Sequence, residues 1–315
     1  MDKLVDSYEN HDIYEIIETL NHDYISLRES RIHKMLNTTL ENLRDFRIGR
    51  IFRRALTYRY VRKHLHLPRN TTLPLLVHAK PPGKVVVYSC IAGPYDLPRE
   101  PFHPEPGIEY VLYTDQPKIN PDTIWQYRDI PQDVLQMSSN GKARNEYIRT
   151  HPQEFFPEYD YSIYVDGNMK IMSDISSWAS LVSPKAGIAA HRHAGCGCVY
   201  KEGKRNLLWK RGNAKGLKAQ MAYYKAEGVP EDMGRLLETT VLVTDLRNPV
   251  ARQIYDVWWE DFHKWNSYRD QMSAPYALWK LGIDLDDVGT LGINVWRNPK
   301  LRLYQHEMKR YHEEK

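Results

Sequence analysis

The sequence predicts an α/β fold preceded by a helical N-terminal extension, and three short apolar runs carry this prediction. The runs cover residues 85–88, 108–114 and 161–165, and small residues or a carboxylate follow each one, at Ala92-Gly93, Asp115 and Asp166. Buried strands that end in this way, separated by loops and helices, are typical of an α/β sheet with a ligand site along one edge. Helices are expected around residues 145–150 and from Asp270 onward.

Length and composition fit a globular protein with a sizeable core. The chain has 315 residues, of which 42% are apolar and 27% charged, as in ordinary globular proteins. No apolar run reaches the roughly 18 residues of a membrane span, and the amino terminus MDKLVDSYENHD is too polar for a signal peptide. Three cysteines do not suggest a disulfide framework. We therefore expect a cytoplasmic protein.

The net charge of +4 is unevenly distributed along the chain. The first twenty residues are acidic, whereas residues 44–63 form a basic segment with an apolar side, in which Asp45 is the one acid. Its cations are Arg44, Arg47, Arg50, Arg53, Arg54, Arg59, Arg62 and Lys63. Such a helix can lie on the anionic inner surface of a membrane, or it can pack on the main domain with its arginines in water. Nucleic acid is not expected, because the basic residues are not interleaved with stacking aromatics.

Proline and small polar residues interrupt the helical pattern at residues 66–84. We therefore expect a helical, basic extension at residues 1–79 and a catalytic domain at residues 80–315.

The third run ends in Asp166-Gly167-Asn168. Asp-Gly and Gly-Asn pairs are strong turn signals, because glycine and asparagine tolerate positive φ. Open α/β sheets also place ligands at the carboxyl ends of their strands, which gives Asp166 a functional interpretation. The residues alone leave both interpretations open.

Several motifs in order resemble one known family. They are VYSCIAGPYD, YVLYTD, NGKARNEYIRT, YSIYVDGN, HRHAGCGCVYKE, LLETTVLVTD and SYRDQMSAPYALW. Together they resemble the glycosyltransferase-like family that includes plant proteins linked to seed mucilage and turgor regulation, with many bacterial members. The resemblance spans about residues 84–300. It implies a glycosyltransferase fold of the A type, a single Rossmann-like α/β/α domain that uses a nucleotide-sugar donor.

The resemblance also implies a divalent cation, Mn²⁺ or Mg²⁺, that bridges the two phosphates of the donor. Asp166 is the expected anchor. Asn168 stands where the usual Asp-X-Asp motif has a second carboxylate, so its amide either ligates the cation or hydrogen-bonds the sugar. His306 is expected to complete the metal shell. Gly167 would let the donor approach the backbone closely.

Further donor-binding residues follow from the resemblance. Lys142 and Arg144 precede a helix and would grip the diphosphate. Ala92, Gly93 and Tyr95 are expected near the base and the ribose, with Asp115 as a second contact, and His191 is expected near the donor or the acceptor. The run HRHAGCGC also suggests a zinc site, but its histidines and cysteines are too close together in the sequence to arrange easily as four tetrahedral ligands.

The triplet Arg269-Asp270-Gln271 would lie at the sugar end of the pocket. Asp270 is the expected general base of an inverting reaction or the residue that orients the donor in a retaining one. An Asp in the first turn of a helix is also favourable without any function. Glu238 is expected as an acceptor-side carboxylate, or as a residue that caps its strand.

The sequence thus predicts a glycosyltransferase that moves a sugar from a nucleotide-sugar donor to a polysaccharide or a lipid-linked glycan. One alternative is a lipid amide hydrolase, since a plant member of the family has been described as a ceramidase. Neither Gly-X-Ser-X-Gly nor His-Glu-X-X-His occurs in the chain, which disfavours it. The other alternative is a non-catalytic module that binds a nucleotide sugar.

Overall fold

The computed structural model describes residues 80–118, 122–193, 197–233, 236–293 and 295–304. The predicted extension at residues 1–79, with its basic segment, and His306 lie outside the described residues. The domain boundary therefore stays a prediction.

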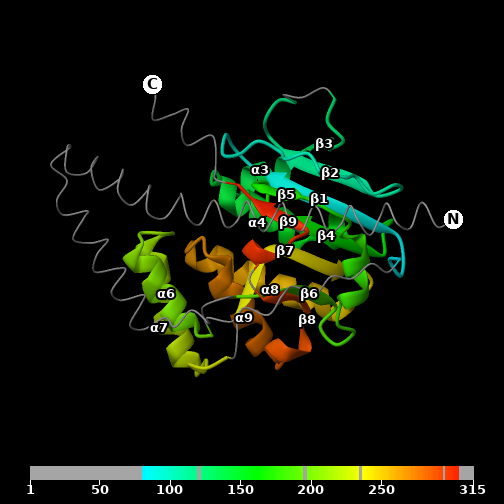
Figure 1. Cartoon of the computed structure of the whole chain (residues 1–315). Helices are drawn as coiled ribbons and strands as arrows, with labels where there is room; N and C mark the ends of the chain where they lie inside the picture. The colour runs from blue at the N-terminus through cyan, green and yellow to red at the C-terminus, as the bar shows by residue number, and fades with distance from the viewer. Residues whose placement is uncertain (1–79, 119–121, 194–196, 234–235, 294, 305–315) are drawn as a thin grey trace, which may run out of the picture. The chain divides into compact units, whose positions relative to one another are not determined.

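A seven-stranded sheet in the order β3-β2-β1-β4-β7-β6-β8 forms the centre of the described domain (Figure 1). Its strands are β1 (Val85–Ile91), β2 (Glu109–Thr114), β3 (Gln126–Asp129), β4 (Tyr161–Val165), β6 (Ile188–Arg192), β7 (Leu237–Asp245) and β8 (Gly289–Ile293). Strand β7 is antiparallel to both neighbours, and the other pairs are parallel. The start of β7 therefore lies at the same edge as the carboxyl ends of the other strands.

Alternate residues of the strands point to two different layers, as the period of two requires. On one face, Val86 and Tyr88 join a core shared with the longer helices. On the other face, Val85 and Val87 pack in a second core with Trp178. Here the described cover is the 3₁₀ helix η1 (Ser176–Leu181) and a two-stranded antiparallel sheet of β5 (Met169–Ile171) and β9 (Leu301–Leu303). The predicted α/β class with one Rossmann-like sheet is confirmed.

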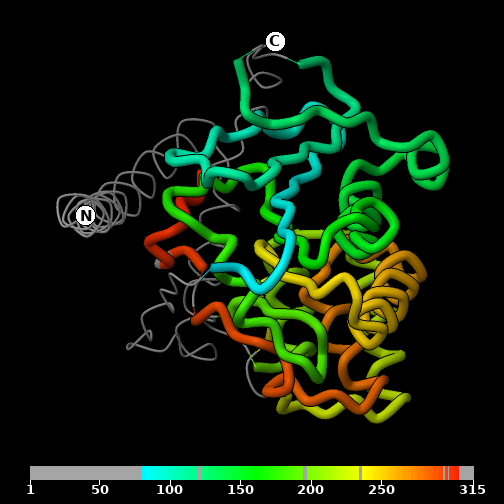
Figure 2. Tube along the Cα trace, turned by 90° about the vertical axis from the view of Figure 1, so that its right-hand side faces the viewer, coloured from blue at the N-terminus to red at the C-terminus, as the bar shows by residue number. Residues whose placement is uncertain are grey.

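Several helices cover the first face in the described residues, and three of them begin at asparagine caps. The helices are α3 (Gln132–Met137), α4 (Gly141–Thr150), α5 (Pro152–Phe155), α6 (Val199–Leu208), α7 (Ala214–Glu227), α8 (Pro249–Trp265) and α9 (Asp270–Lys280), and the short 3₁₀ segments η2 (Leu285–Asp287) and η3 (Val295–Arg297) follow. Asn140, Asn213 and Asn248 cap α4, α7 and α8 with their side chains, which satisfies donors at the helix starts. Helices α4 and α8 lie side by side (Figure 2). None of the helices in the described part of the chain combines the length and apolar character needed to cross a membrane.

Candidate active site

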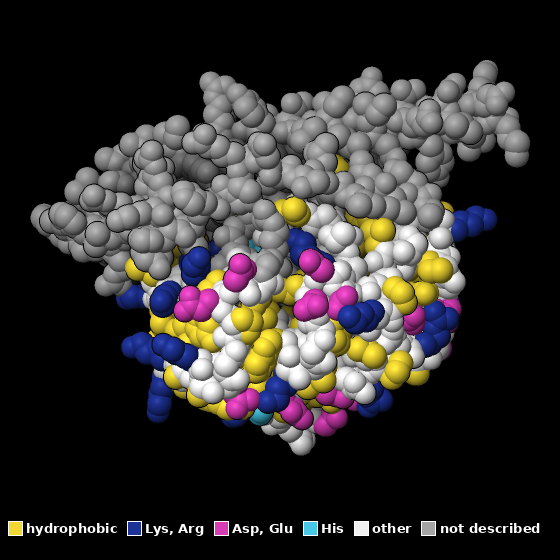
Figure 3. All heavy atoms as spheres, turned by 90° about the horizontal axis from the view of Figure 1, so that it is seen from below, with side chains coloured by type: hydrophobic (Ala, Val, Ile, Leu, Met, Phe, Trp, Pro, Cys, Tyr) yellow, Lys and Arg dark blue, Asp and Glu magenta, His cyan; other side chains and the backbone are white. Residues whose placement is uncertain are grey.

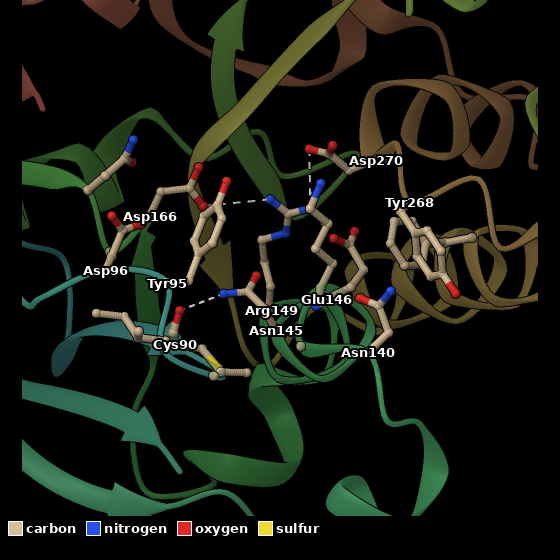
Figure 4. A pocket seen from close by; sticks show the side chains of 18 of the residues that line it. Cys90, Tyr95, Asp96, Asn140, Asn145, Glu146, Arg149, Asp166, Tyr268 and Asp270 are labelled. Carbon is tan, nitrogen blue, oxygen red and sulfur yellow. Dashed lines mark hydrogen bonds and ion pairs between the residues drawn. The ribbon is translucent and has the colours of Figure 1, made fainter. Parts of the chain in front are cut away.

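A cavity of about 420 Å³ opens where β1 and β4 end (Figure 4). Its walls come from the loop after β1, the start and inner face of α4, the loop after β4 and the turn that leads into α9. The predicted residues that line it are Ala92, Gly93, Tyr95, Lys142, Asp166, Gly167, Asn168, Arg269 and Asp270. The fold therefore brings together most of the residues selected from the sequence.

Arg149 of α4 lines this cavity. Its guanidinium is buried, with 5% of the side chain exposed, and contacts three carboxylates. Nη2 donates to Glu146 and lies 3.2 Å from Oδ2 of Asp270, while Nη1 lies 3.9 Å from Oδ1 of Asp166. Figure 4 shows the guanidinium between Asp166 and Asp270. One buried cation thus connects acids from α4, the loop after β4 and the start of α9.

Asp270 is held as a carboxylate by its surroundings. Burial alone would raise its pKa, but the charges of Arg149 and Arg269 outweigh burial and lower the pKa to about 2. The hydroxyl of Thr239 in β7 also donates to it, and hydrogen bonds to the charged form act in the same direction. Asp270 therefore presents a fixed negative charge to the cavity.

The pKa of Glu146 is shifted in the opposite direction. Burial raises its pKa to about 8, because this effect exceeds the attraction of Arg149 and because Asp270 repels a second negative charge. Its Oε1 is buried without a hydrogen-bond partner in the described part of the chain. At neutral pH Glu146 therefore carries a proton, and the charge of Arg149 is available to Asp166 and Asp270.

The Asp-Gly-Asn motif lies at the cavity wall. Oδ1 of Asp166 accepts from the Tyr164 hydroxyl at 2.9 Å, and its side chain is 35% exposed. At Gly167 a Cβ would come within 2.5 Å of the Ile91 side chain, so packing against β1 is itself a reason for glycine. Nδ2 of Asn168 donates to the carbonyl of Tyr304 at 3.1 Å, which leaves the amide oxygen as the atom able to act as a ligand.

A cation fits this motif only if substrate and water supply most of its ligands. No three His, Cys, Asp or Glu residues within the described ranges are grouped closely enough to hold a metal. The carboxylate of Asp166 and the amide oxygen of Asn168 are hard oxygen donors. This set suits Mg²⁺ or Mn²⁺, since Mg²⁺ commonly takes one or two carboxylates and completes its shell with phosphates and water.

Two predicted donor-binding residues lie behind the cavity wall. Oδ1 of Asp115 accepts from the backbone N–H of Gly93 at 2.7 Å, where φ is +82°. Arg144 lies 3.3 Å from Asp115 and donates to the carbonyls of Ser138 and Leu135. Both side chains thus shape the loop after β1, and neither lines the cavity.

Glu238, Gln271 and His191 also lie outside the lining. Gln271 donates to Glu238 at 3.0 Å and accepts from Arg269 at 2.5 Å, so it connects β7 to the cavity. Burial raises the pKa of Glu238 to about 7. His191 is fully buried beside Asn298, and burial lowers its pKa to about 3, which keeps the ring neutral.

Sequence reasoning did not select Asn145, Glu146 or Arg149. Asn145 donates to the Cys90 carbonyl at 2.5 Å, which ties α4 to β1. Glu146 and Arg149 are three residues apart on one helical face, and this spacing was a signal that these polar residues share one side of α4.

Comparisons with known proteins give one family. A family model described as "TOD1/MUCI70, glycosyltransferase-like domain" matches residues 134–306, more than half of the 315 residues. No curated protein matches the chain.

Among solved structures, the apo form of mouse xyloside xylosyltransferase 1 has 9% identity and a TM-score of 0.39, covering 70% of this chain and 97% of that one. The galactosyltransferase LgtC, in complex with donor and acceptor sugar analogs, has 12% identity and a TM-score of 0.37, covering 61% and 70%. The bifunctional glycosyltransferase WbbM, as an apo structure, has 11% identity and a TM-score of 0.38, and the similarity covers 66% of this chain but only 40% of WbbM. These similarities are too distant to indicate a donor or an acceptor.

Proposed function

Because this chain belongs to the TOD1/MUCI70 glycosyltransferase-like family, we propose that it transfers a sugar from a nucleotide-sugar donor to a hydroxyl group of a polysaccharide or a lipid-linked glycan. The observation that supports this most is the contact of Arg149 with Asp166 and Asp270 at the edge of one cavity. This contact brings Asp166, the candidate residue for the donor phosphates, close to Asp270, the candidate residue for the donor sugar. This edge of an α/β sheet is where ligands usually bind.

In the proposed reaction, the acceptor oxygen forms a bond to the anomeric carbon of the donor sugar. The bond between that carbon and the diphosphate oxygen breaks, and the nucleoside diphosphate leaves with the electron pair. The acceptor hydroxyl loses its proton, which the departing diphosphate oxygen can take up because it carries the electron pair. The protein therefore has to stabilise negative charge on the diphosphate and positive charge on the sugar ring.

The phosphate side would be formed by Asp166, Asn168 and Lys142. Asp166 and Asn168 would hold Mg²⁺ or Mn²⁺, which neutralises charge on the departing diphosphate. Lys142, in the first turn of α4, lines the cavity and brings a positive charge to the same region. The start of a helix also favours an anion.

The sugar side would be formed by Asp270 with Arg269. A carboxylate with a pKa of about 2 is a weak base at neutral pH. This favours the second role considered for Asp270, in which a fixed negative charge orients the donor and stabilises positive charge at the anomeric carbon. Arg149 and Arg269 hold that carboxylate in place.

The location of the protein is also part of the proposal. We retain the cytoplasm as its compartment and the anionic inner membrane surface as a partner of the basic segment at residues 44–63. Both rest on the sequence, because that segment lies outside the described residues.

A panel of nucleotide sugars tests this function without knowledge of the acceptor. Release of nucleoside diphosphate, with and without Mn²⁺, is measured for the parent and for Asp166→Ala. The parent should hydrolyse at least one donor, and Asp166→Ala should not. Asp256→Ala, at an exposed position of α8, is the matched control and should behave as the parent. Binding of a nucleoside diphosphate without hydrolysis of any donor would instead support a non-catalytic module.

A further inference from the structure

The hairpin of α6 and α7 carries a cluster of exposed cations, which we name the basic surface. It consists of Lys201, Lys204, Lys210, Arg211, Lys215 and Lys218, all of which are exposed. Within residues 201–218 the one carboxylate is Glu202, which is buried and paired with Arg205. Figure 3 shows Lys and Arg side chains gathered at the left edge of the molecule, where Figure 1 places α6 and α7.

The arrangement of these cations follows from the two helices. Lys201 and Lys204 are three residues apart on α6, as are Lys215 and Lys218 on α7, so each pair shares one helical face. In the described residues, none of the six cations forms a salt bridge. The next carboxylate along the chain is Glu227, which ends α7 and pairs with Lys280, and Glu231 interacts electrostatically with Tyr200 at the start of α6. The turn end of the hairpin, with Lys210, Lys215 and Lys218, has no carboxylate of its own, because residues 203–226 contain neither Asp nor Glu.

The turn between the two helices connects the basic surface to the cavity. The backbone N–H of Asn213 donates to the carbonyl of Ser267 at 3.1 Å, and a Cβ at Gly212 would come within 2.3 Å of that carbonyl oxygen. The turn thus packs directly on the segment that leads into Arg269 and Asp270.

Arg211 completes this connection through its charge. Partial burial, followed by the like charges of Arg269 and Arg205, lowers the pKa of Arg211, and Tyr95 also interacts with it electrostatically. Arg269 and Tyr95 both line the cavity. Arg211 therefore brings positive charge from the hairpin close to the cavity wall, where Asp96 also interacts electrostatically with Tyr95.

We propose that the acceptor is an anionic glycan, which lies along the basic surface and places its reactive end in the cavity. This inference rests on the proposed glycosyl transfer. Carboxylate, sulfate or phosphate groups on the glycan would pair with the lysines, and Arg211 would contact the part nearest the cavity. Such contacts select the acceptor and raise its local concentration without taking part in the chemistry.

Other anionic partners fit this surface less well. A membrane-docking helix usually presents large apolar side chains beside its cations. The exposed large apolar residues of the described chain are Phe102, Ile124, Trp296 and Leu303, and none is on the hairpin. A single-stranded nucleic acid would need aromatic rings open for stacking. Trp209, the aromatic residue of the turn, is only partly exposed and lies beside the guanidinium groups of Arg205 and Arg211.

A charge-removal variant tests the proposal. It combines Lys204→Gln, Lys210→Gln, Lys215→Gln and Lys218→Gln, none of which lines the cavity. The matched control combines Lys80→Gln, Lys118→Gln, Lys185→Gln and Arg252→Gln, at four exposed positions elsewhere. Affinity electrophoresis in alginate, dextran sulfate and neutral dextran measures binding. The parent and the control should be retarded by a charged glycan but not by dextran, and the test variant should lose at least tenfold in affinity.

Two further measurements connect the surface to the cavity and separate this inference from the proposed function. Bound alginate oligosaccharide should slow hydrogen exchange at residues 209–213 and 266–270 in the parent. Donor hydrolysis without acceptor should be equal in the parent and the test variant. If no donor is hydrolysed, glycosyl transfer is contradicted, while the binding data still decide whether the surface takes an anionic glycan.

Three results would overturn the inference. One is an equal loss of affinity in the control variant, and another is the absence of glycan binding by the parent at low salt. The third is a difference between parent and test variant that appears only with vesicles containing anionic lipid, because the partner would then be a membrane.

Discussion

The guanidinium of Arg149 lies 3.2 Å from the carboxylate of Asp270 and joins α4 to the first turn of α9 inside the protein. The same guanidinium contacts Glu146 and reaches Asp166. The positions of Asp166 and Asp270 in the proposed site therefore depend on the buried guanidinium of Arg149. Changes at Arg149 should affect stability and turnover in different proportions, depending on whether the positive charge is kept.

Replacement of Arg149 by methionine should destabilise the fold strongly. Removing one partner of a buried ion pair typically costs about 3–5 kcal/mol, because the remaining charge is left without compensation. Arg149→Lys keeps the charge but loses the planar fork that contacts several carboxylates at once. We expect the melting temperature of Arg149→Lys to lie between those of the parent and Arg149→Met. We also expect Arg149→Lys to hydrolyse the donor at least tenfold more slowly than the parent.

Thermal unfolding and donor hydrolysis measure these effects, and Arg252→Lys, at a side chain that is 61% exposed, is the control. Parental turnover in Arg149→Lys would show that the arrangement of Asp166 and Asp270 does not depend on the guanidinium.

Glu146 should make the stability of the fold depend on pH. Folding raises its pKa from 4.5 to about 8, mainly through burial. The folded protein thus holds a proton that the unfolded chain releases, so this stabilisation is complete below pH 4.5 and is lost as the pH rises towards 8. Glu146→Gln removes the titration. Between about pH 5 and pH 9, the melting temperature of this variant should fall less than that of the parent, and equal falls would contradict the assignment.

Ionisation of Glu146 should also lower the rate of donor hydrolysis at alkaline pH. Above pH 8, ionised Glu146 competes with Asp166 and Asp270 for Arg149, so we expect donor hydrolysis by the parent to decline. Glu146→Gln resembles the protonated form and should keep its rate at about pH 9. Profiles of kcat against pH for both proteins measure this. An alkaline decline of the same size in both would assign it to another group.

The local features of the fold were predictable from the sequence. Strands β1, β2 and β4 were predicted because each is an apolar run followed by a small residue or a carboxylate, and the start of α9 was predicted at Asp270. Helix α4 was expected around residues 145–150 but begins at Gly141, so Lys142 and Arg144 lie inside the helix that they were expected to precede. The reversal of β7 was not predicted. Its buried pattern suits either direction, and the pairing with β4 and β6 depends on how distant segments pack.

The residues of the candidate site also fall into those that the sequence predicted and those that it did not. Asp166 and Asp270 were selected because each stands at the end or start of an element, in a motif with a family resemblance. The spacing of Glu146 and Arg149 placed them on one side of α4, but their role was missed because Thr239 and Asp270, which Arg149 contacts, are far away in the sequence. No local pattern reports such distant contacts. Nor does any local pattern indicate that backbone carbonyls hold Arg144 behind the cavity wall.

Asn168→Asp should test the metal side of the site. The change adds a second carboxylate beside Asp166, so a lower concentration of Mn²⁺ should support donor hydrolysis. It also removes the hydrogen bond to the Tyr304 carbonyl, which should cost about 1 kcal/mol of stability without metal. Asn248→Asp, which keeps a helix cap on α8, is the control for added charge. If the Mn²⁺ requirement is unchanged, Asn168 does not bind the cation, and its amide would instead hydrogen-bond the sugar.

The last prediction concerns Gly141, the first residue of α4. A Cβ here would come within 2.4 Å of the Ala92 carbonyl oxygen, so the start of α4 or the loop after β1 must move. Both segments line the cavity. Gly→Ala within a helix usually stabilises by roughly 0.5–1 kcal/mol, whereas forcing extra volume into a packed site costs about 1–3 kcal/mol. We expect Gly141→Ala to be less stable than the parent and to bind nucleoside diphosphate more weakly.

The matched control for this prediction is Gly203→Ala in α6. Its Cβ would meet the flexible end of Met221, which can move aside at lower cost. Urea unfolding and calorimetric titration with a nucleoside diphosphate distinguish the two variants. If Gly141→Ala is as stable as the parent and binds the nucleotide equally well, the close approach of α4 to β1 does not set the shape of the cavity.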